Sequence, residues 1–65
     1  MWTVVYLAKS KKEADRMSNR LTQEGFLVKT QPVSKNANED DGYFEILVPE
    51  GEVEEAHGIL VESGY

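Results

Sequence analysis

The stretch WTVVYLAKSKKE (residues 2–13) decides the fold, because it joins a strand pattern directly to the start of a helix. Residues 2–8 are mostly β-branched, aromatic or aliphatic, which favours a pleated and buried strand. Alternation predicts that the two faces of this strand carry Thr3, Val5 and Leu7, and Trp2, Val4 and Tyr6. Because both faces are apolar, we expect both of them to be covered.

A capping box predicts where the first helix starts. In residues 10–13 (SKKE), the serine oxygen can accept a hydrogen bond from a free amide, and Glu13 can reach back. The helix is predicted over residues 11–24 and ends at Gly25, because glycine adopts the left-handed conformation without strain. Its core stripe consists of Ala14, Met17, Ser18 and Leu21. Phe26 is expected to pack back on Leu21.

Two further strands and a second helix follow. Residues 26–33 predict a second strand that lies or ends at a sheet edge, because Pro32 has no amide donor. Residues 42–48 predict a third strand, which Pro49 ends. Residues 51–62 predict the second helix, whose acidic first turn suits the helix dipole. The apolar stripe of this helix contains Val53, Ala56, His57 and Leu60.

The order of elements predicts an α+β fold, a βαββα two-layer sandwich that forms a single domain over residues 1–65. The first crossover should be right-handed and place its helix on one face of the sheet, and the second helix should join it there. We expect the strand order 1-3-2, with the third strand central. The uncovered face, the candidate interface, should then carry Trp2, Val4, Tyr6, Tyr43 and Leu47.

Three stretches match a known family pattern: WTVVY (residues 2–6), LTQEG (residues 21–25) and EILVPEGEVEEAH (residues 45–57). They resemble a prokaryotic family of small βαββα proteins that is assigned to signal transduction and has no established function. The resemblance covers nearly the whole chain except the loop at 34–41. It implies a bacterial protein with a truncated ferredoxin-like fold that lacks the usual fourth strand. It carries over no catalytic residue.

Composition limits how so small a chain can be stabilised. Sixty-five residues build only a small core, which usually needs a disulfide, a structural metal or a partner chain. The chain has no cysteine and one histidine, which excludes disulfides and cysteine- or histidine-rich zinc sites. A partner chain remains, and we expect a homodimer that uses the uncovered sheet face or the edge of the first strand. The N-terminus has neither a signal-peptide pattern nor a membrane span, so we expect a cytoplasmic protein that does not bind membranes.

Charge is divided unevenly along the chain. Residues 1–35 hold all seven basic residues and three acidic ones, whereas residues 36–65 hold nine acidic residues and no basic one. The two halves are expected to attract each other, within one chain or between two, or to form two separately solvated helix faces. The candidate basic stripe consists of Lys9, Lys12, Arg16 and Arg20, with Lys29 nearby. Such a stripe could bind nucleic acid, but the net charge of −5 disfavours it.

Other binding patterns are weak. Residues 36–42 place oxygens at alternate positions, as a calcium-binding loop does, but Asp41 and Leu47 stand at the sixth and twelfth positions, where an EF-hand needs glycine and glutamate. We therefore interpret this segment as a solvated hairpin loop. Tyr6 and Tyr43 suggest a base-stacking sheet, but Glu45 stands where a second aromatic residue is needed and would repel phosphates.

Nothing in the sequence indicates an enzyme or a cofactor. His57 has no serine, cysteine or aspartate partner at a telling spacing, and the five glycines form no phosphate-binding loop. We therefore expect no catalytic residue, no metal site and no cofactor. The leading hypothesis is a small regulatory or protein-interaction domain that acts as a homodimer. The alternatives are a small-ligand sensor and, less favoured, a nucleic-acid binder that uses the basic first helix.

Overall fold

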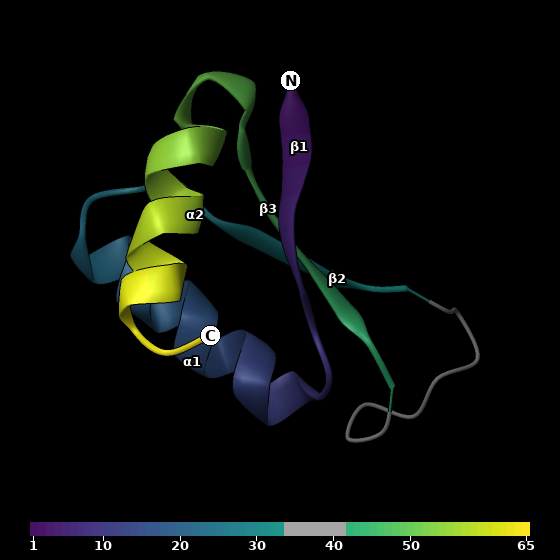
Figure 1. Ribbon diagram of the computed structural model, residues 1–65. Helices are drawn as coiled ribbons and strands as arrows, with labels where there is room; N and C mark the ends of the chain where they lie inside the picture. The colour runs from purple at the N-terminus through teal and green to yellow at the C-terminus, as the bar shows by residue number, and fades with distance from the viewer. Residues whose placement is uncertain (34–41) are drawn as a thin grey trace.

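The computed structural model describes residues 1–33 and 42–65, which form a three-stranded sheet with two helices on one side (Figure 1). In chain order, the elements are β1 (Trp2–Ala8), α1 (Lys11–Gln23), β2 (Lys29–Pro32), β3 (Phe44–Pro49), the 3-10 turn η1 (Glu50–Glu52) and α2 (Val53–Glu62). The sheet order is β1-β3-β2, and both β1 and β2 run antiparallel to β3. The predicted α+β fold and strand order are confirmed.

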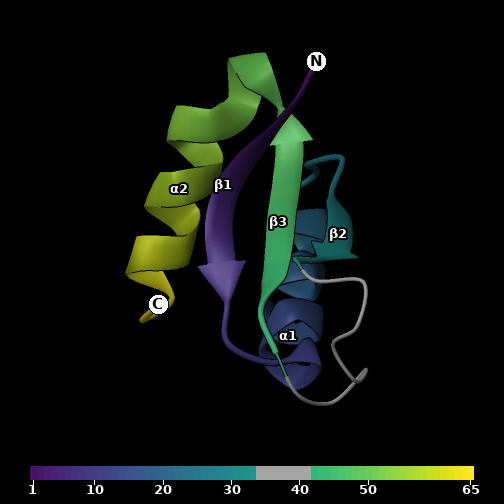
Figure 2. The same cartoon turned by 90° about the vertical axis from the view of Figure 1, so that its right-hand side faces the viewer.

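The two helices cover the sheet unequally. Figure 2 looks onto the sheet, and α1 lies behind β3 and β2 while α2 lies along the outer side of β1. Figure 1 shows the same sheet from its edge, with both helices on one side. The opposite side of the sheet carries no helix among the described residues. We call it the open face.

An irregularity in β1 changes which of its side chains face the helices. The register with β3 pairs Val4 with Leu47 but Tyr6 with Ile46, so Val5 is an extra residue in β1. Such a β-bulge shifts the alternation of side chains by one position. Val5 is buried on the helix side, and Tyr6 packs against the core as well. Leu7 is turned to the open face instead of the core.

Backbone pairing explains why a proline can end β3 inside the ladder. The Glu50 amide donates to the Met1 carbonyl at 2.8 Å, so these two residues form a hydrogen-bonded pair. Hydrogen-bonded and non-hydrogen-bonded pairs alternate, so Trp2 and Pro49 form a non-hydrogen-bonded pair. The missing amide of Pro49 is therefore not needed by β1. The prediction that Pro49 lies outside the strand was wrong for this reason.

The second strand is shorter than predicted. It spans Lys29–Pro32, whereas residues 26–28 connect it to α1 outside the ladder. Phe26 takes part in the end of α1 rather than in the sheet. Its amide donates to the Leu21 carbonyl at 3.0 Å, and the Gly25 amide donates to Thr22 at 3.0 Å. These two bonds form a Schellman motif, which requires the positive φ of 94° at Gly25.

The second helix ends in the same way. The Tyr65 amide donates to the Leu60 carbonyl at 3.1 Å, the Gly64 amide donates to Val61 at 3.1 Å, and Gly64 has a φ of 96°. Each glycine is followed by an aromatic residue that packs on the core, Phe26 in one case and Tyr65 in the other. A hydrophobic contact of this kind commonly accompanies the motif. Both helix ends therefore anchor the chain to the core.

The core lies between the sheet and the helices. Its fully buried large side chains come from both layers: Met17, Leu21, Ile46, Val48 and Leu60. The predicted stripe of α1 is confirmed at Ala14, Met17 and Leu21. In α2, Ala56 and Leu60 are buried, whereas His57 is exposed.

We predict that Leu21→Ala and Phe44→Ala each lower the free energy of unfolding by about 2–5 kcal/mol, because each removes buried methylene or ring contacts. For so small a domain, this loss can abolish the folded state. Urea titration followed by circular dichroism measures the change. Leu27→Ala is the control, since Leu27 is 67% exposed. Equal midpoints for Leu21→Ala and Leu27→Ala would contradict the assignment of the core.

A pair of glycine substitutions should have opposite effects. Gly58 lies inside α2, and a Cβ atom added there meets nothing within 4 Å. Gly58→Ala should therefore stabilise the protein by about 0.5–1 kcal/mol. Gly25→Ala should destabilise it by about 1–2 kcal/mol, because its φ of 94° strains any residue with a Cβ atom. Thermal unfolding of both variants checks the prediction, and a shift of the same sign in both would refute it.

Candidate interaction surfaces

The open face consists of rows of side chains that run across the three strands. Val4, Leu47 and Lys29 form one row, because Leu47 pairs with Val4 on one side and with Lys29 on the other. Leu7, Glu45 and Gln31 form the next row by the same pairing. Apolar side chains thus gather over β1, and polar ones gather over β2.

A cation–π contact lies on this face next to Leu47. The Lys29 ammonium group lies 5.6 Å from the centre of the Trp2 ring. Because Lys29 belongs to β2 and Trp2 to β1, this contact spans the central strand β3. Leu47 lies between these two residues in the sheet and is only 8% exposed, although no helix of the described residues covers it. We infer that Trp2 and Lys29 cover Leu47. Leu47 was predicted as an interface residue, and the structure leaves little of it accessible to a partner.

Tyr6 does not lie on the open face, so its predicted placement there was wrong. It packs against the core on the helix side, and its ring centre lies 6.5 Å from that of His57 on α2. The bulge at Val5 is the physical cause, since it turns Tyr6 inward and Leu7 outward. Leu7 is therefore a surface residue that simple alternation missed. Trp2, Val4 and Tyr43 do lie on the open face, and all three are exposed.

The rest of the open face consists of a polar row and of two apolar residues beyond it. The Gln31 side-chain amide donates to the Glu45 carboxylate at 2.7 Å, which links β2 to β3. The Val33 amide donates to the Tyr43 carbonyl at 3.0 Å, so the exposed side chains of these two residues lie beside each other. Tyr43 and Val33 thus extend the apolar part of the face beyond the polar row.

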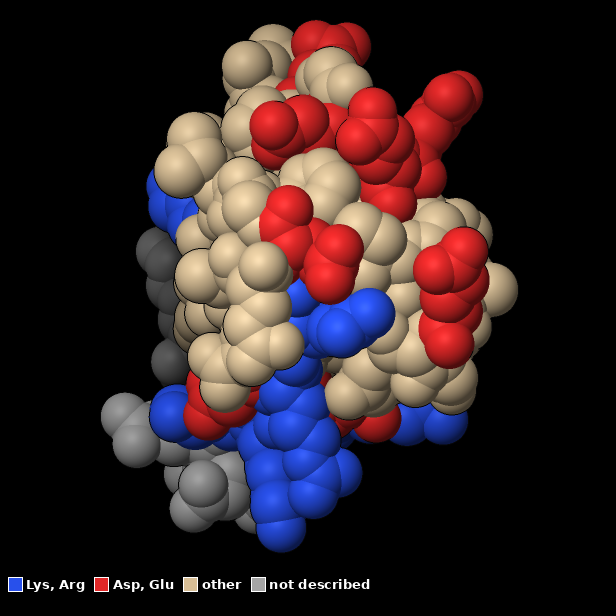
Figure 3. Space-filling view, turned by 90° about the vertical axis from the view of Figure 1, so that its left-hand side faces the viewer, with Lys and Arg blue, Asp and Glu red and all other residues tan. Residues whose placement is uncertain are grey.

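Opposite charges occupy opposite ends of the helix side. Figure 3 shows acidic side chains gathered where η1 and α2 begin and basic side chains gathered over α1. We call the first group the acidic end, formed by Glu50, Glu52, Glu54 and Glu55. We call the second the basic end, formed by Lys9, Lys12, Arg16 and Arg20. The predicted basic stripe therefore exists as a surface feature.

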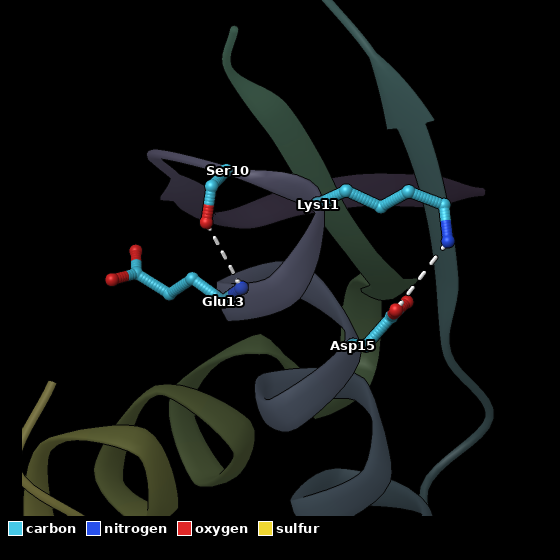
Figure 4. Close-up of polar contacts among 4 residues, drawn as sticks. All are labelled: Ser10, Lys11, Glu13 and Asp15. Atoms are coloured by element: carbon cyan, nitrogen blue, oxygen red, sulfur yellow. Dashed lines mark hydrogen bonds and ion pairs between the residues drawn. The ribbon is translucent and has the colours of Figure 1, made fainter. Parts of the chain in front are cut away.

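Two basic side chains of α1 pair with acidic side chains one turn further along the chain. Lys11 lies 3.5 Å from Asp15 (Figure 4), and Arg20 lies 3.7 Å from Glu24. Among residues 1–33 and 42–65, no ion pair joins α1 to α2. Attraction between the two halves of the chain is thus not expressed as direct contacts within this part of the molecule.

One further carboxylate, that of Glu13, is hydrogen-bonded at the start of α1. The Ser10 hydroxyl accepts from the Glu13 amide at 3.1 Å (Figure 4). The Glu13 carboxylate accepts from the Lys9 amide at 3.0 Å. The capping box is confirmed, with the reach-back made one residue before the cap. By contrast, one oxygen of Glu52 at the acidic end is buried and has no hydrogen-bond partner among the described residues.

The other candidate sites gain no support from geometry. His57 is exposed, and Tyr6 is the aromatic ring beside it. The described residues contain no group of side chains that could hold a metal ion and no detectable pocket. Of the segment 36–42 that was compared with a calcium site, residues 36–41 lie outside the described residues.

Comparisons with known proteins add no relative: no family profile, no curated protein and no solved structure matches this chain. In the described part of the chain, neither helix has the length and apolar character needed to cross a bilayer.

The placement of Tyr6 and Leu7 can be tested by one pair of substitutions. Tyr6→Glu should lower the free energy of unfolding by about 1–3 kcal/mol, because it puts a charge against the core. Leu7→Glu should change it by about 0.5 kcal/mol or less, because Leu7 is exposed. Urea titration of both variants measures the difference. If Leu7→Glu is the more damaging change, β1 lacks the bulge.

Proposed function

We propose that this chain is a small regulatory or protein-interaction domain of the bacterial cytoplasm that acts as a homodimer through its open face. In this proposal the chain has no catalytic role. The resemblance of its sequence to a family assigned to signal transduction supports the proposal. The observation that carries the proposal is a row of exposed apolar side chains along β1. Trp2, Val4 and Leu7 are 43%, 45% and 47% exposed on a face that no helix of the described residues covers.

The anchors of this interface differ in part from those predicted. Trp2 and Tyr43 remain, and Leu7 takes the place of Tyr6. Large amphipathic residues such as tryptophan and tyrosine are enriched at the centres of interfaces. A twofold arrangement would bring the same apolar row of each subunit into contact, so one patch serves both subunits.

The size of the face predicts a weak dimer. Strands of seven, six and four residues, with about 3.3 Å per residue and about 4.8 Å between strands, give a planar footprint of roughly 270 Å². A standard interface buries about 800 Å² on each partner. We therefore expect association that depends on protein concentration rather than a permanent dimer.

Nucleic-acid binding and small-ligand sensing are the alternatives. Two basic side chains of α1 are paired with acidic neighbours, and the same surface carries the acidic end, which disfavours a nucleic-acid backbone. A dimer groove that holds a metabolite would require the dimer to form first. Both alternatives therefore depend on features that are weaker than the apolar row.

The proposal is tested by sedimentation velocity over about 10 μM to about 1 mM, the range in which weak interfaces dissociate. We expect the wild-type sedimentation coefficient to rise with concentration. Leu7→Glu should remain monomeric over this range, because it places two carboxylates against each other in the dimer.

Val61→Glu is the matched control, because Val61 has a similar exposure of 52% but lies on α2. It should associate like the wild type. A wild-type monomer at every concentration would refute the homodimer, and equal association of Leu7→Glu would place the interface elsewhere.

A further inference from the structure

The outer edge of β1 has free backbone groups that can be assigned residue by residue. Since Met1 pairs with Glu50 by a hydrogen bond, Thr3 and Val48 form the next hydrogen-bonded pair. The amides and carbonyls of Trp2 and Val4 then point away from β3. After the bulge, Leu7 occupies the same kind of position, opposite Glu45. Three residues of β1 thus present both an amide and a carbonyl to the outer edge.

The two edges of the sheet are protected to different degrees. At the opposite edge, β2 has only four residues, and the Val33–Tyr43 bond shows that Thr30 and Pro32 are the residues whose backbone points outward. Pro32 has no amide, so that edge offers few donors. By contrast, β1 has seven residues, and although its bulge at Val5 is a feature that can protect an edge, it has neither a proline nor a charged side chain. Edge strands usually carry such protection when nothing pairs with them.

The second helix extends past this edge. Figure 2 shows α2 along the outer side of β1, where the sheet itself has ended. His57 is exposed on the flank of α2 that contacts Tyr6 of β1. Val61, one turn further along the same flank, is also exposed. A strand added to β1 would place its helix-side residues against this flank and cover it.

The position of α2 disfavours a second copy as the occupant. A twofold pairing of β1 with β1 of another copy, with both helix layers on one side, would place the two α2 helices next to the same edge. Adjacent strands lie about 4.8 Å apart, whereas packed helices need about 8–10 Å between their axes. A single extended chain without a helix layer meets no such obstacle.

An antiparallel strand is favoured because antiparallel pairing is slightly more stable per residue than parallel pairing. Charge then specifies which end of such a strand should be acidic and which basic. The Trp2 end of β1 lies beside η1, since Glu50 is hydrogen-bonded to Met1, and the acidic end begins there. The other end of β1 leads directly into Lys9 and the basic end. A strand antiparallel to β1 starts near Lys9 and finishes near Glu50. It is therefore favoured when its first residues are acidic and its last residues are basic.

We propose that the outer edge of β1 binds an extended peptide segment of a partner protein by β-strand addition. The peptide runs antiparallel to β1, carries apolar residues at alternate positions toward α2, and changes from acidic to basic along its length. Main-chain hydrogen bonds to Trp2, Val4 and Leu7 provide affinity, and the α2 flank provides selectivity. This edge is a different surface from the open face, so the proposal stands independently of the homodimer.

The probe is a synthetic nine-residue peptide with two glutamates, then alternating valine and threonine, then two lysines. Amide hydrogen exchange measured by NMR is the readout. At saturating peptide, the amides of Trp2, Val4 and Leu7 should exchange at least about tenfold more slowly, because each gains a hydrogen bond. The Thr3 amide, which already faces β3, should change little.

Three controls make the result specific. The same peptide with N-methyl groups on alternate amides, placed to block its bonds to β1, should not bind. A peptide with its glutamates and lysines exchanged should bind about fivefold more weakly, with the difference reduced at high salt. In the protein, Val4→Pro removes an outward amide without disturbing the pairing with β3, and it should weaken binding while the circular dichroism spectrum is preserved.

Equal binding of the N-methylated peptide, or protection confined to residues outside β1, would overturn the proposal. So would failure of the unmodified peptide to protect the three amides at millimolar concentration. Protection of the same amides that rises with protein concentration in the absence of peptide would show that a second copy occupies the edge, and it would also overturn the proposal.

Discussion

The extra residue in β1 opposite Ile46 determines which side chains of β1 face the helices and which face the open side of the sheet. A regular strand would have sent Leu7 into the core and Tyr6 to the open face. The bulge instead places Val5 and Tyr6 beneath the helices, where Tyr6 meets α2. Because the side chains of a sheet alternate strictly, no compensating change elsewhere in β1 restores the original arrangement. The core, the apolar row and the contact between β1 and α2 therefore all depend on this one insertion.

Most of the fold follows from local signals in the sequence. The capping residues Ser10 and Glu13, the terminating Gly25 and the apolar spacing of Ala14, Met17 and Leu21 each act within one or two turns, so they can be read without tertiary information. The strand order also follows from connection rules. The bulge could not be predicted in this way, because alternation in WTVVYLA is equally apolar in both registers and only the pairing with β3 chooses between them.

The bulge also explains why only some of the residues on the open face were predicted correctly. Trp2, Val4 and Tyr43 lie where their parity places them, whereas Tyr6 and Leu7 are exchanged by the bulge. The covering of Leu47 depends on a contact between Trp2 and Lys29 across the central strand. Such a contact requires the β1-β3-β2 order and the register of both ladders, and no local pattern specifies it. Lys11 and Arg20 pair with Asp15 and Glu24, which are their neighbours in the chain, so part of the basic charge of α1 is neutralised locally.

The position of the last residue has a practical consequence for tethering. Tyr65 is held by the Schellman motif of α2, and Figure 2 shows the C-terminus on the outer side of β1, toward the end of that strand that leads to α1. A segment fused after Tyr65 through a short flexible linker would approach β1 from that end and run antiparallel to it. Linking converts binding into an intramolecular event with an effective concentration in the millimolar range. Even a sequence with modest intrinsic affinity would then occupy the edge for most of the time, which makes the C-terminus a natural attachment point for comparing candidate strands and a poor place for an apolar purification tag.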